Sequence, residues 1–429
     1  MTLTDSITLL KTLLSGHTPG QLVIQITDHC NARCPQCGMR ITQHFKRSRL
    51  PADDIKRMLD AAAEQGVQAV SFTGGEPFLM SEVLVDLIRH AGKAGIRYIR
   101  TGTNGFMFQR SGQPGFETRI SKLAEILAES PLRNFWISID SADADVHEAM
   151  RGLPGVIRGI EKAIPVFHAH GLYPSANLGI NRNISGKPIR KLMPSDADHS
   201  AKETDRFYRE FRSGFRAFFR FVKDMGFTIV NCCYPMSIDT GSDPDELKPV
   251  YEATSTGDIV RFSRQEKALV YRALSETLTE FRSGIRIFTP RCSLYRLIQY
   301  YADHIETPYP CRGGLDYWFV NSQDGNVYPC GFRGHENHGK LWNRNEIHRP
   351  SSSTCTLCDW ECFRDPSELF GPLTEALSAP RQLAGRLGRD WPFFRLWLQD
   401  LRYYLACDWF DGNKPPEYGK MAAVGGKED

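Results

Sequence analysis

Residues 22–37 read LVIQITDHCNARCPQC, in which an apolar run leads directly into three closely spaced cysteines. The run Leu22–Thr27 has the length and apolar content of a buried β-strand. Cys30, Cys34 and Cys37 then share one short loop, and soft sulfur ligands suit an iron–sulfur cluster. Because no fourth cysteine lies nearby, one iron of a four-iron cluster would stay open to a further ligand. The sequence therefore predicts an open cluster at the end of a first strand.

The distribution of the twelve cysteines favours metal binding over disulfide bonds. Most of them gather in two groups, at residues 30–37 and 311–362, in a long chain whose N-terminus lacks the features of a signal peptide. A closed zinc site needs four protein ligands, and His29 or His44 could complete one with the first group, so zinc is the alternative there. Four other cysteines lack ligand-like spacing and are expected to be reduced and buried: Cys232, Cys233, Cys292 and Cys407.

Beyond the cysteine loop, short apolar runs alternate with helical patterns as far as residue 232. Repeats of this length are typical of parallel strands joined by helical crossovers. They predict an α/β fold, a partial (β/α)6 TIM-like barrel, with functional residues at the C-terminal ends of its strands. The expected strands are Leu22–Thr27, Val67–Thr73, Ile96–Thr103, Asn134–Ile139, Ser175–Ile180 and Thr228–Cys232. The expected helices between them cover residues 51–65, 82–94, 120–129 and 156–169.

Glycine-rich and polar motifs follow several of these strands. Thr73-Gly74-Gly75-Glu76-Pro77 ends the second strand, where glycine lets the chain approach a ligand closely. Ser138-Ile139-Asp140 ends the fourth, and its carboxylate could contact a ligand or cap the next helix. Asn181 and Arg182 follow the fifth strand. The run Thr103-Asn104-Gly105 ends the third strand and could line the same site or form a turn.

Taken in order, these motifs resemble the radical SAM superfamily. Its members carry a Cys-x3-Cys-x2-Cys loop after the first barrel strand, as at Cys30, Cys34 and Cys37, and a GGEP run after the second. The resemblance covers about residues 20–235, roughly half of the chain. It implies a [4Fe–4S] cluster whose open iron binds S-adenosylmethionine (SAM). Reductive cleavage of SAM would give a 5′-deoxyadenosyl radical that abstracts hydrogen from a substrate.

The resemblance also implies roles for single residues. One position departs from the family pattern, because the residue before the last cysteine is usually aromatic and touches adenine, whereas here it is Gln36. Tyr234, after the sixth strand, could replace that contact. The residues expected to bind SAM are Gly74, Gly75, Glu76 and Pro77 for its methionyl amine, Ser138 and Asp140 for its ribose, and Asn181 and Arg182 for its carboxylate.

A second cysteine group follows the barrel. Two short strands within residues 317–330, joined by an Asp-Gly turn, would bring Cys311 and Cys330 together. The pattern is similar to a shortened version of the SPASM/Twitch domains that follow many radical SAM barrels, which implies one auxiliary [4Fe–4S] cluster. A structural zinc knuckle is the alternative. Five cysteines compete for at most four ligand positions: Cys311, Cys330, Cys355, Cys358 and Cys362, with Cys292 as an outside candidate.

The chain is expected to divide into four parts. These are an N-terminal extension over residues 1–19, the barrel over 20–284, the auxiliary-cluster domain over 285–365 and a helical tail over 366–429. Within the barrel, residues 205–225 form a helix with a phenylalanine stripe opposite an arginine stripe. Its basic face is expected to be solvated, with docking of an acidic partner as the alternative. The aromatic tail is expected to pack on the barrel, with a membrane-surface role as the alternative.

These features lead to one functional hypothesis and two alternatives. The leading hypothesis is a radical SAM oxidoreductase or maturase that acts in the cytoplasm on a peptide or a small molecule such as a sugar. It would use an electron donor such as flavodoxin or ferredoxin. The alternatives are a radical SAM enzyme acting on lipid or nucleic acid and a non-catalytic iron–sulfur or zinc electron-transfer scaffold. A net charge of +3 gives no reason to expect a polyanionic partner, and no apolar run is long enough to span a membrane. No residue can be assigned as a catalytic acid or base.

Overall fold

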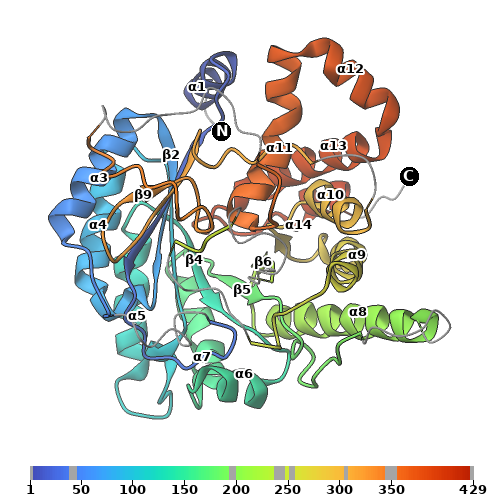
Figure 1. Cartoon of the computed structure of the whole chain (residues 1–429). Coiled ribbons are helices and arrows are strands. Elements are labelled where there is room, and N and C mark those ends of the chain that lie inside the picture. The colour runs from blue at the N-terminus through green and yellow to red at the C-terminus, as the bar shows by residue number, and fades with distance from the viewer. Residues whose placement is uncertain are drawn as a thin grey trace.

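The computed structural model describes residues 3–37, 46–192, 200–235, 247–250, 257–303, 308–343 and 355–425. His44, the alternative zinc ligand, lies outside these ranges. Within them the chain folds around one mainly parallel sheet with helices packed on its outside (Figure 1). None of the described helices is long and apolar enough to cross a lipid bilayer.

Nine strands of the described chain form a single sheet in the order β7-β6-β5-β4-β3-β2-β1-β8-β9. Neighbouring strands from β7 to β8 run parallel, and β9 pairs with β8 in antiparallel fashion. The first six strands agree with the predicted ones to within two residues, which confirms the partial barrel. The strands are β1 (Gly20–Thr27), β2 (Val67–Gly74), β3 (Tyr98–Thr103), β4 (Leu132–Ser138), β5 (Ser175–Gly179), β6 (Ile229–Cys233), β7 (Arg286–Ile287), β8 (Tyr317–Val320) and β9 (Val327–Tyr328).

Two features of the sheet differ from the sequence prediction. A further parallel strand, β7, has two residues, which is too short for periodicity to reveal. The strand β8, which the sequence places in an appended domain, pairs in parallel with β1, where Trp318 lies beside Leu22. The hairpin of β8 and β9 therefore extends the barrel sheet. It also brings Cys311 and Cys330 into one apolar cluster with Val23 of the first strand.

The helices that follow the strands cover the outer face of the sheet (Figure 1). Their apolar faces pack against the strands in one continuous core, which includes Ile55, Leu59 and Leu87. The helices of this layer are α3 (Ala52–Glu64), α4 (Ser81–Lys93), α5 (Phe116–Ala128), α6 (Ala144–Arg151), α7 (Val156–Ala169), α8 (Ser200–Asp224), α9 (Arg264–Phe281) and α10 (Arg291–Tyr301). Two 3-10 turns, η1 (Pro77–Met80) and η2 (Phe106–Phe108), follow β2 and β3, and α1 (Leu3–Leu14) precedes β1.

The helix α8 has the two faces that the sequence predicts, and part of its basic face forms ion pairs at the surface. Its apolar stripe is fully buried and consists of Phe207, Phe211, Phe215, Phe218 and Val222. Two arginines of its opposite stripe pair with α9 while staying about one third exposed. Arg212 lies 3.4 Å from Glu276 and 3.3 Å from Glu280, and Arg216 donates to Glu280 at 2.7 Å. These ion pairs lower the positive charge that an acidic partner would meet.

The tail folds into the helices α11 (Glu361–Ser378), α12 (Pro380–Arg389), α13 (Trp391–Ala406) and α14 (Tyr418–Gly425), with the 3-10 turn η3 (Asp408–Phe410) after α13. As the sequence predicts, the tail packs on the barrel, and Phe393, Phe394 and Tyr403 form part of a second core with Ile229 of β6. The segment after η3 closes the N-terminal end of the barrel. There the amide of Gly412 donates to the carbonyl of Arg133 in β4 at 2.6 Å.

Candidate functional site

The loop of the first cysteine group leaves the C-terminal end of β1 and is held from two sides. Asn104, just after β3, donates from Nδ2 to the Sγ of Cys30 at 3.6 Å and to the Oδ1 of Asn31 at 2.8 Å. From the side of α6, the carbonyl of Arg151 accepts a hydrogen bond from the amide of Arg33 at 2.8 Å. Asn104 therefore contacts the loop as well as forming a turn, as its motif allowed.

The three thiols of this loop lie close to one another at the barrel mouth. Burial raises the pKa of Cys30 and Cys34, and negative charge on Cys37 adds to both shifts, an effect that requires proximity. Burial raises the pKa of Cys34 to about 12, while the positive charge of Arg151 opposes that shift. Cys30 and Cys34 therefore hold their protons at neutral pH until a metal displaces them.

The glycines of the GGEP run lie directly against the chain that leads to the cysteines. A Cβ at Gly74 would lie 2.1 Å from the carbonyl oxygen of Thr27, and one at Gly75 would lie 2.1 Å from that of His29. The amides of Gly75 and Glu76 donate to the same two carbonyls at 2.7 Å and 2.8 Å. No larger residue fits at either glycine without moving the backbone. The run therefore fixes the position of the cysteine loop.

The carboxyl group of Glu76 is buried between the ends of β2 and β3. Its Oε1 accepts from the amide of Phe78 at 3.0 Å, and its Oε2 accepts from the amide of Asn104 at 2.6 Å. Burial raises the pKa of Glu76 to about 7, although these two donors act in the opposite direction. Among the described residues no ion pair neutralises it, so the carboxylate can still accept hydrogen bonds from a cationic ligand.

Asp140, just after β4, joins the cysteine loop to α6. Its Oδ2 accepts from the Nε2 of Gln36 at 2.7 Å and from the Nε and Nη2 of Arg151, both at 2.8 Å. Asp140 and Arg151 are both buried. The alternative that Asp140 caps the next helix is wrong, because Asp143 is the N-cap of α6 and accepts from the amide of Val146. Asp140 orients the loop and leaves its Oδ1 for a further contact.

Arg182 is used mainly to anchor α9. Its Nη2 pairs with Glu266 at 2.7 Å and donates to the carbonyl of Arg261, and its Nε donates to the carbonyl of Asp258. Its guanidinium also lies 4.4 Å from the ring of Phe262. The remaining nitrogen, Nη1, is buried without a hydrogen bond among the described residues. Only this nitrogen is left for the predicted contact with a carboxylate.

The other predicted SAM contacts are close to these residues. Asn181 is buried and donates from Nδ2 to the carbonyls of Asp140 at 2.8 Å and Gly179 at 2.7 Å. Ser138 ends β4 and is half-buried. Tyr234 is buried, and its hydroxyl donates to Asp365 of α11 at 3.1 Å, so this side chain is already held by the tail.

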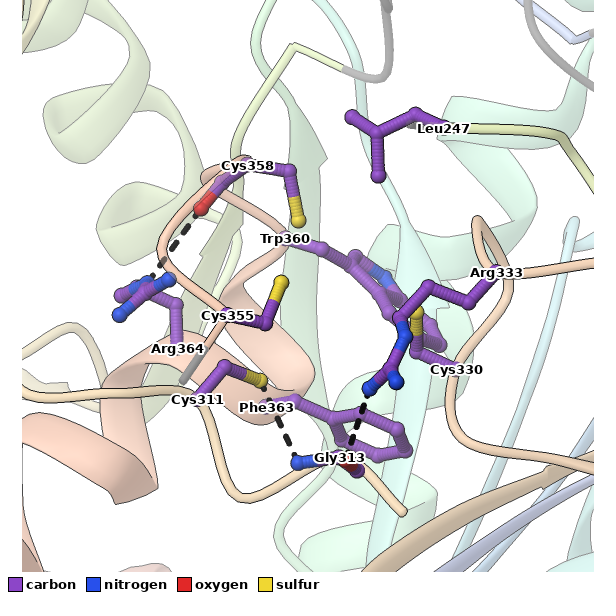
Figure 2. Close-up of a pocket in the computed structure, with 10 residues that line it drawn as sticks. All are labelled: Leu247, Cys311, Gly313, Cys330, Arg333, Cys355, Cys358, Trp360, Phe363 and Arg364. Carbon is purple, nitrogen blue, oxygen red and sulfur yellow. Dashed lines mark hydrogen bonds between the residues drawn. The ribbon is translucent and has the colours of Figure 1, made fainter. Parts of the chain in front are cut away.

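Four cysteines of the second group line one pocket. Their sulfur atoms point toward a common space (Figure 2), and they belong to Cys311, Cys330, Cys355 and Cys358. In the described ranges no three His, Cys, Asp or Glu side chains meet closely enough to hold a single metal ion. The four thiols thus surround a space instead of meeting at one point. Cys362, the fifth candidate, does not line this pocket.

The pocket around these thiols combines apolar walls with two cations. The rings of Trp360 and Phe363 form part of its wall, and Arg333 and Arg364 border it (Figure 2). Burial raises the pKa of Cys358 to about 12, and the charge of Arg364 opposes this shift. Positive charge in an apolar pocket stabilises anionic sulfur. The donor set therefore fits an anionic iron–sulfur cluster.

Cys362 turns instead toward the end of β6. Its Sγ lies 3.7 Å from the Oε1 of Glu361, whose Oε2 accepts from the amide of Tyr234 at 3.3 Å. Burial raises the pKa of Glu361 to about 7. Burial raises the pKa of Cys362, and the charge of Arg100, a side chain inside the barrel, opposes this shift, so this thiol lies near the barrel interior.

Sequence reasoning missed Arg151 and Glu361. Arg151 lies at the end of α6 in no recognisable motif, and only the fold brings it to Asp140. Glu361 begins α11 beside a cysteine, which gave no sign that its carboxyl turns toward β6. In both cases the role of the residue is visible only as a contact between segments that lie far apart in the sequence.

Comparisons with known proteins agree with this geometry. The AdoMet-dependent heme synthase of Methanosarcina barkeri is 21% identical over 363 residues, which cover 83% of this chain and 87% of that protein. The GTP 3′,8-cyclase of Listeria monocytogenes is 33% identical over 167 residues, which cover 37% of this chain and 44% of the cyclase. Among solved structures, Streptococcus suis SuiB bound to the precursor peptide SuiA shares the fold, with a TM-score of 0.51, 16% identity and coverage of 81% of this chain and 70% of SuiB.

The sequence profile of the radical SAM superfamily matches residues 24–180. That match starts within β1 and ends directly after β5, so it contains the cysteine loop, the GGEP run and Asp140. The residues that the match contains are the ones that the fold brings together at the barrel mouth. The match assigns residues 24–180 of this chain to the radical SAM superfamily.

Proposed function

We propose that this enzyme holds a [4Fe–4S] cluster on Cys30, Cys34 and Cys37 and binds SAM at the open iron. When bound, the cluster supplies the electron that cleaves SAM to a 5′-deoxyadenosyl radical. The observation that carries this proposal is the attachment of the GGEP run to the cysteine loop. Two backbone hydrogen bonds, at 2.7 Å and 2.8 Å, tie a SAM-binding motif to a three-thiol loop.

The residues around the loop have separate tasks in this proposal. The buried carboxylate of Glu76, which has no ion-pair partner among the described residues, would accept hydrogen bonds from the methionyl ammonium of SAM. Asp140 would present its Oδ1 to the ribose, while its Oδ2 stays bound to Gln36 and Arg151. Nη1 of Arg182 would take the SAM carboxylate.

We further propose that Cys311, Cys330, Cys355 and Cys358 hold one auxiliary [4Fe–4S] cluster. A tetrahedral zinc ion would need four sulfur atoms close to a single point. The thiols surround a space instead, and Arg333 and Arg364 supply positive charge beside it. This arrangement favours the cluster over the zinc alternative and leaves Cys362 outside the ligand set.

The substrate that we propose is a peptide or a small molecule such as a sugar. The structure of SuiB with its precursor peptide supports the peptide, and the names of the heme synthase and the GTP cyclase support small molecules. A one-electron donor of the flavodoxin or ferredoxin type would reduce the enzyme. Substrates can be screened by the increase in 5′-deoxyadenosine that they cause.

The test is anaerobic reconstitution with iron counted per chain, followed by incubation with SAM and dithionite. We expect about eight irons in the wild type and about four in a variant with alanine at Cys30, Cys34 and Cys37. A variant with alanine at the four pocket cysteines should also hold about four. Only chains that keep the first cysteine group should form 5′-deoxyadenosine. About four irons in the wild type would refute the auxiliary cluster, and none at the first group would refute the main proposal.

A further inference from the structure

The helix α13 has a buried face and an exposed face of unusual composition. Its buried face packs into the second core through Phe393, Phe394, Tyr403 and Tyr404. Its exposed face carries residues at spacings of four and three, which place them in one line along the helix. We call this line the outer stripe, and it consists of Trp391, Arg395, Leu398, Arg402 and Leu405.

The apolar members of the outer stripe are among the most exposed large side chains of the described chain. Trp391 is 56% exposed, Leu398 is 40% exposed and Leu405 is 55% exposed. A single exposed leucine is ordinary, but three large apolar residues in one line form a patch, and such patches mark interaction sites. Two arginines alternate with them, so the stripe is both apolar and cationic.

The acidic residues of this region point away from the outer stripe. Asp390 is buried and paired with Arg296, and Asp400 is buried and pairs with Arg282 at 2.7 Å. No ion pair between described residues involves Arg395 or Arg402. The charge that this helix presents outward is therefore entirely positive.

The preceding helix α12 extends the same kind of surface. None of its residues is fully buried, and Arg381 and Arg389 are exposed. Leu377, just before it, is 46% exposed. In Figure 1 this helix lies at the outer margin of the molecule, above α13. The two helices together present apolar and arginine side chains without an exposed carboxylate.

We propose that the outer stripe and α12 dock this enzyme on an anionic membrane surface. Trp and Leu side chains favour the boundary between headgroups and acyl chains, and arginines pair with lipid phosphates and attract anionic lipids. Because its other face is fixed to the barrel, α13 can lie only in the plane of the membrane. An acidic protein would match the arginines but would leave the exposed tryptophan and leucines less well accounted for.

The test is co-sedimentation of the iron-loaded full chain with vesicles. The wild type should bind vesicles of phosphatidylcholine mixed with phosphatidylserine and should not bind phosphatidylcholine alone. The double variant R395E/R402E should bind the anionic vesicles on the order of tenfold more weakly, because both charges are reversed at the surface. Added salt should weaken wild-type binding, since it screens exposed charges.

Two further variants make the result specific. R119E/R158E changes the same charge at exposed positions on α5 and α7 and should bind as the wild type does. L398S/L405S removes two apolar members while keeping both arginines and should also weaken binding. All variants should keep their iron and their 5′-deoxyadenosine formation, so a failure of the proposed function would be seen separately. The membrane proposal would be refuted if R395E/R402E bound the anionic vesicles as strongly as the wild type does, or if the wild type bound no vesicles. It would also be refuted by a dimer that only the wild type forms.

Discussion

The side-chain amide of Gln36 donates a hydrogen bond to the carboxylate of Asp140 at 2.7 Å, across 104 residues of sequence. The glutamine stands where the family usually has an aromatic residue, and the structure gives it this local partner. Gln36 and Arg151 both bind Oδ2, so the loop that carries the cysteines is tied to the ends of β4 and α6. The geometry of the cysteine loop thus depends on a buried ion pair elsewhere in the barrel.

The first prediction concerns this ion pair. Substituting Arg151→Met leaves the buried carboxylate of Asp140 without its cation and should lower the free energy of unfolding by about 3 kcal/mol. Urea unfolding of the iron-loaded protein measures the change. Arg158→Met, at an exposed position on α7, is the matched control and should change stability by less than about 0.5 kcal/mol. Equal stability of the two variants would contradict the importance of the pair.

The second prediction concerns the contact between Gly75 and His29. Gly75→Ala places a Cβ 2.1 Å from a backbone oxygen that cannot move without displacing the cysteine loop. We expect the variant to lose the irons of the first cluster, about four per chain, while keeping those of the second. Gly112→Ala is the control, because nothing lies within 4 Å of its Cβ position. Full iron content in Gly75→Ala would show that the loop tolerates the shift.

The third prediction separates the five cysteines of the second group. Cys358 lines the four-thiol pocket and Cys362 does not, although only three residues separate them on the chain. Cys358→Ser should lower iron content from about eight to about four, whereas Cys362→Ser should leave about eight. Iron analysis with electron paramagnetic resonance of the reduced proteins would decide. The reverse result would move Cys362 into the ligand set and Cys358 out of it.

The sequence predicts the barrel and the first site well because both depend on local patterns. The apolar run before Cys30 and the two glycines before Glu76 each mark a strand end, and parallel strands bring such ends together. The sequence cannot show that β8 joins β1, since pairing between distant strands leaves no local pattern. The sequence also cannot show which of the five cysteines is not a ligand, because their spacing is compatible with Cys362 inside or outside the ligand set.

The last prediction concerns the buried carboxyl of Glu361. Burial raises its pKa to about 7 from an ordinary value near 4.5. In the unfolded chain the group ionises near the ordinary value, so between these two pH values the folded state binds the proton more tightly. Stability from this group is therefore present at low pH and is lost as pH rises through about 7. A shift of about 2.5 pH units corresponds to about 3 kcal/mol at pH 8.

The variant Glu361→Gln removes this titration while keeping an acceptor for the amide of Tyr234. Relative to the wild type, its free energy of unfolding should rise between pH 5 and pH 8 by an amount on the order of 3 kcal/mol. The buried carboxyl of Glu368 titrates in both proteins, so its effect cancels in the difference, whereas Asp365, whose pKa the charge of Glu361 helps to raise, contributes to the difference in the same direction. Glu129→Gln, at an exposed position, should show no such dependence on pH. A constant difference between Glu361→Gln and the wild type would mean that Glu361 is already ionised at pH 5, held by a cation or donor near the barrel interior.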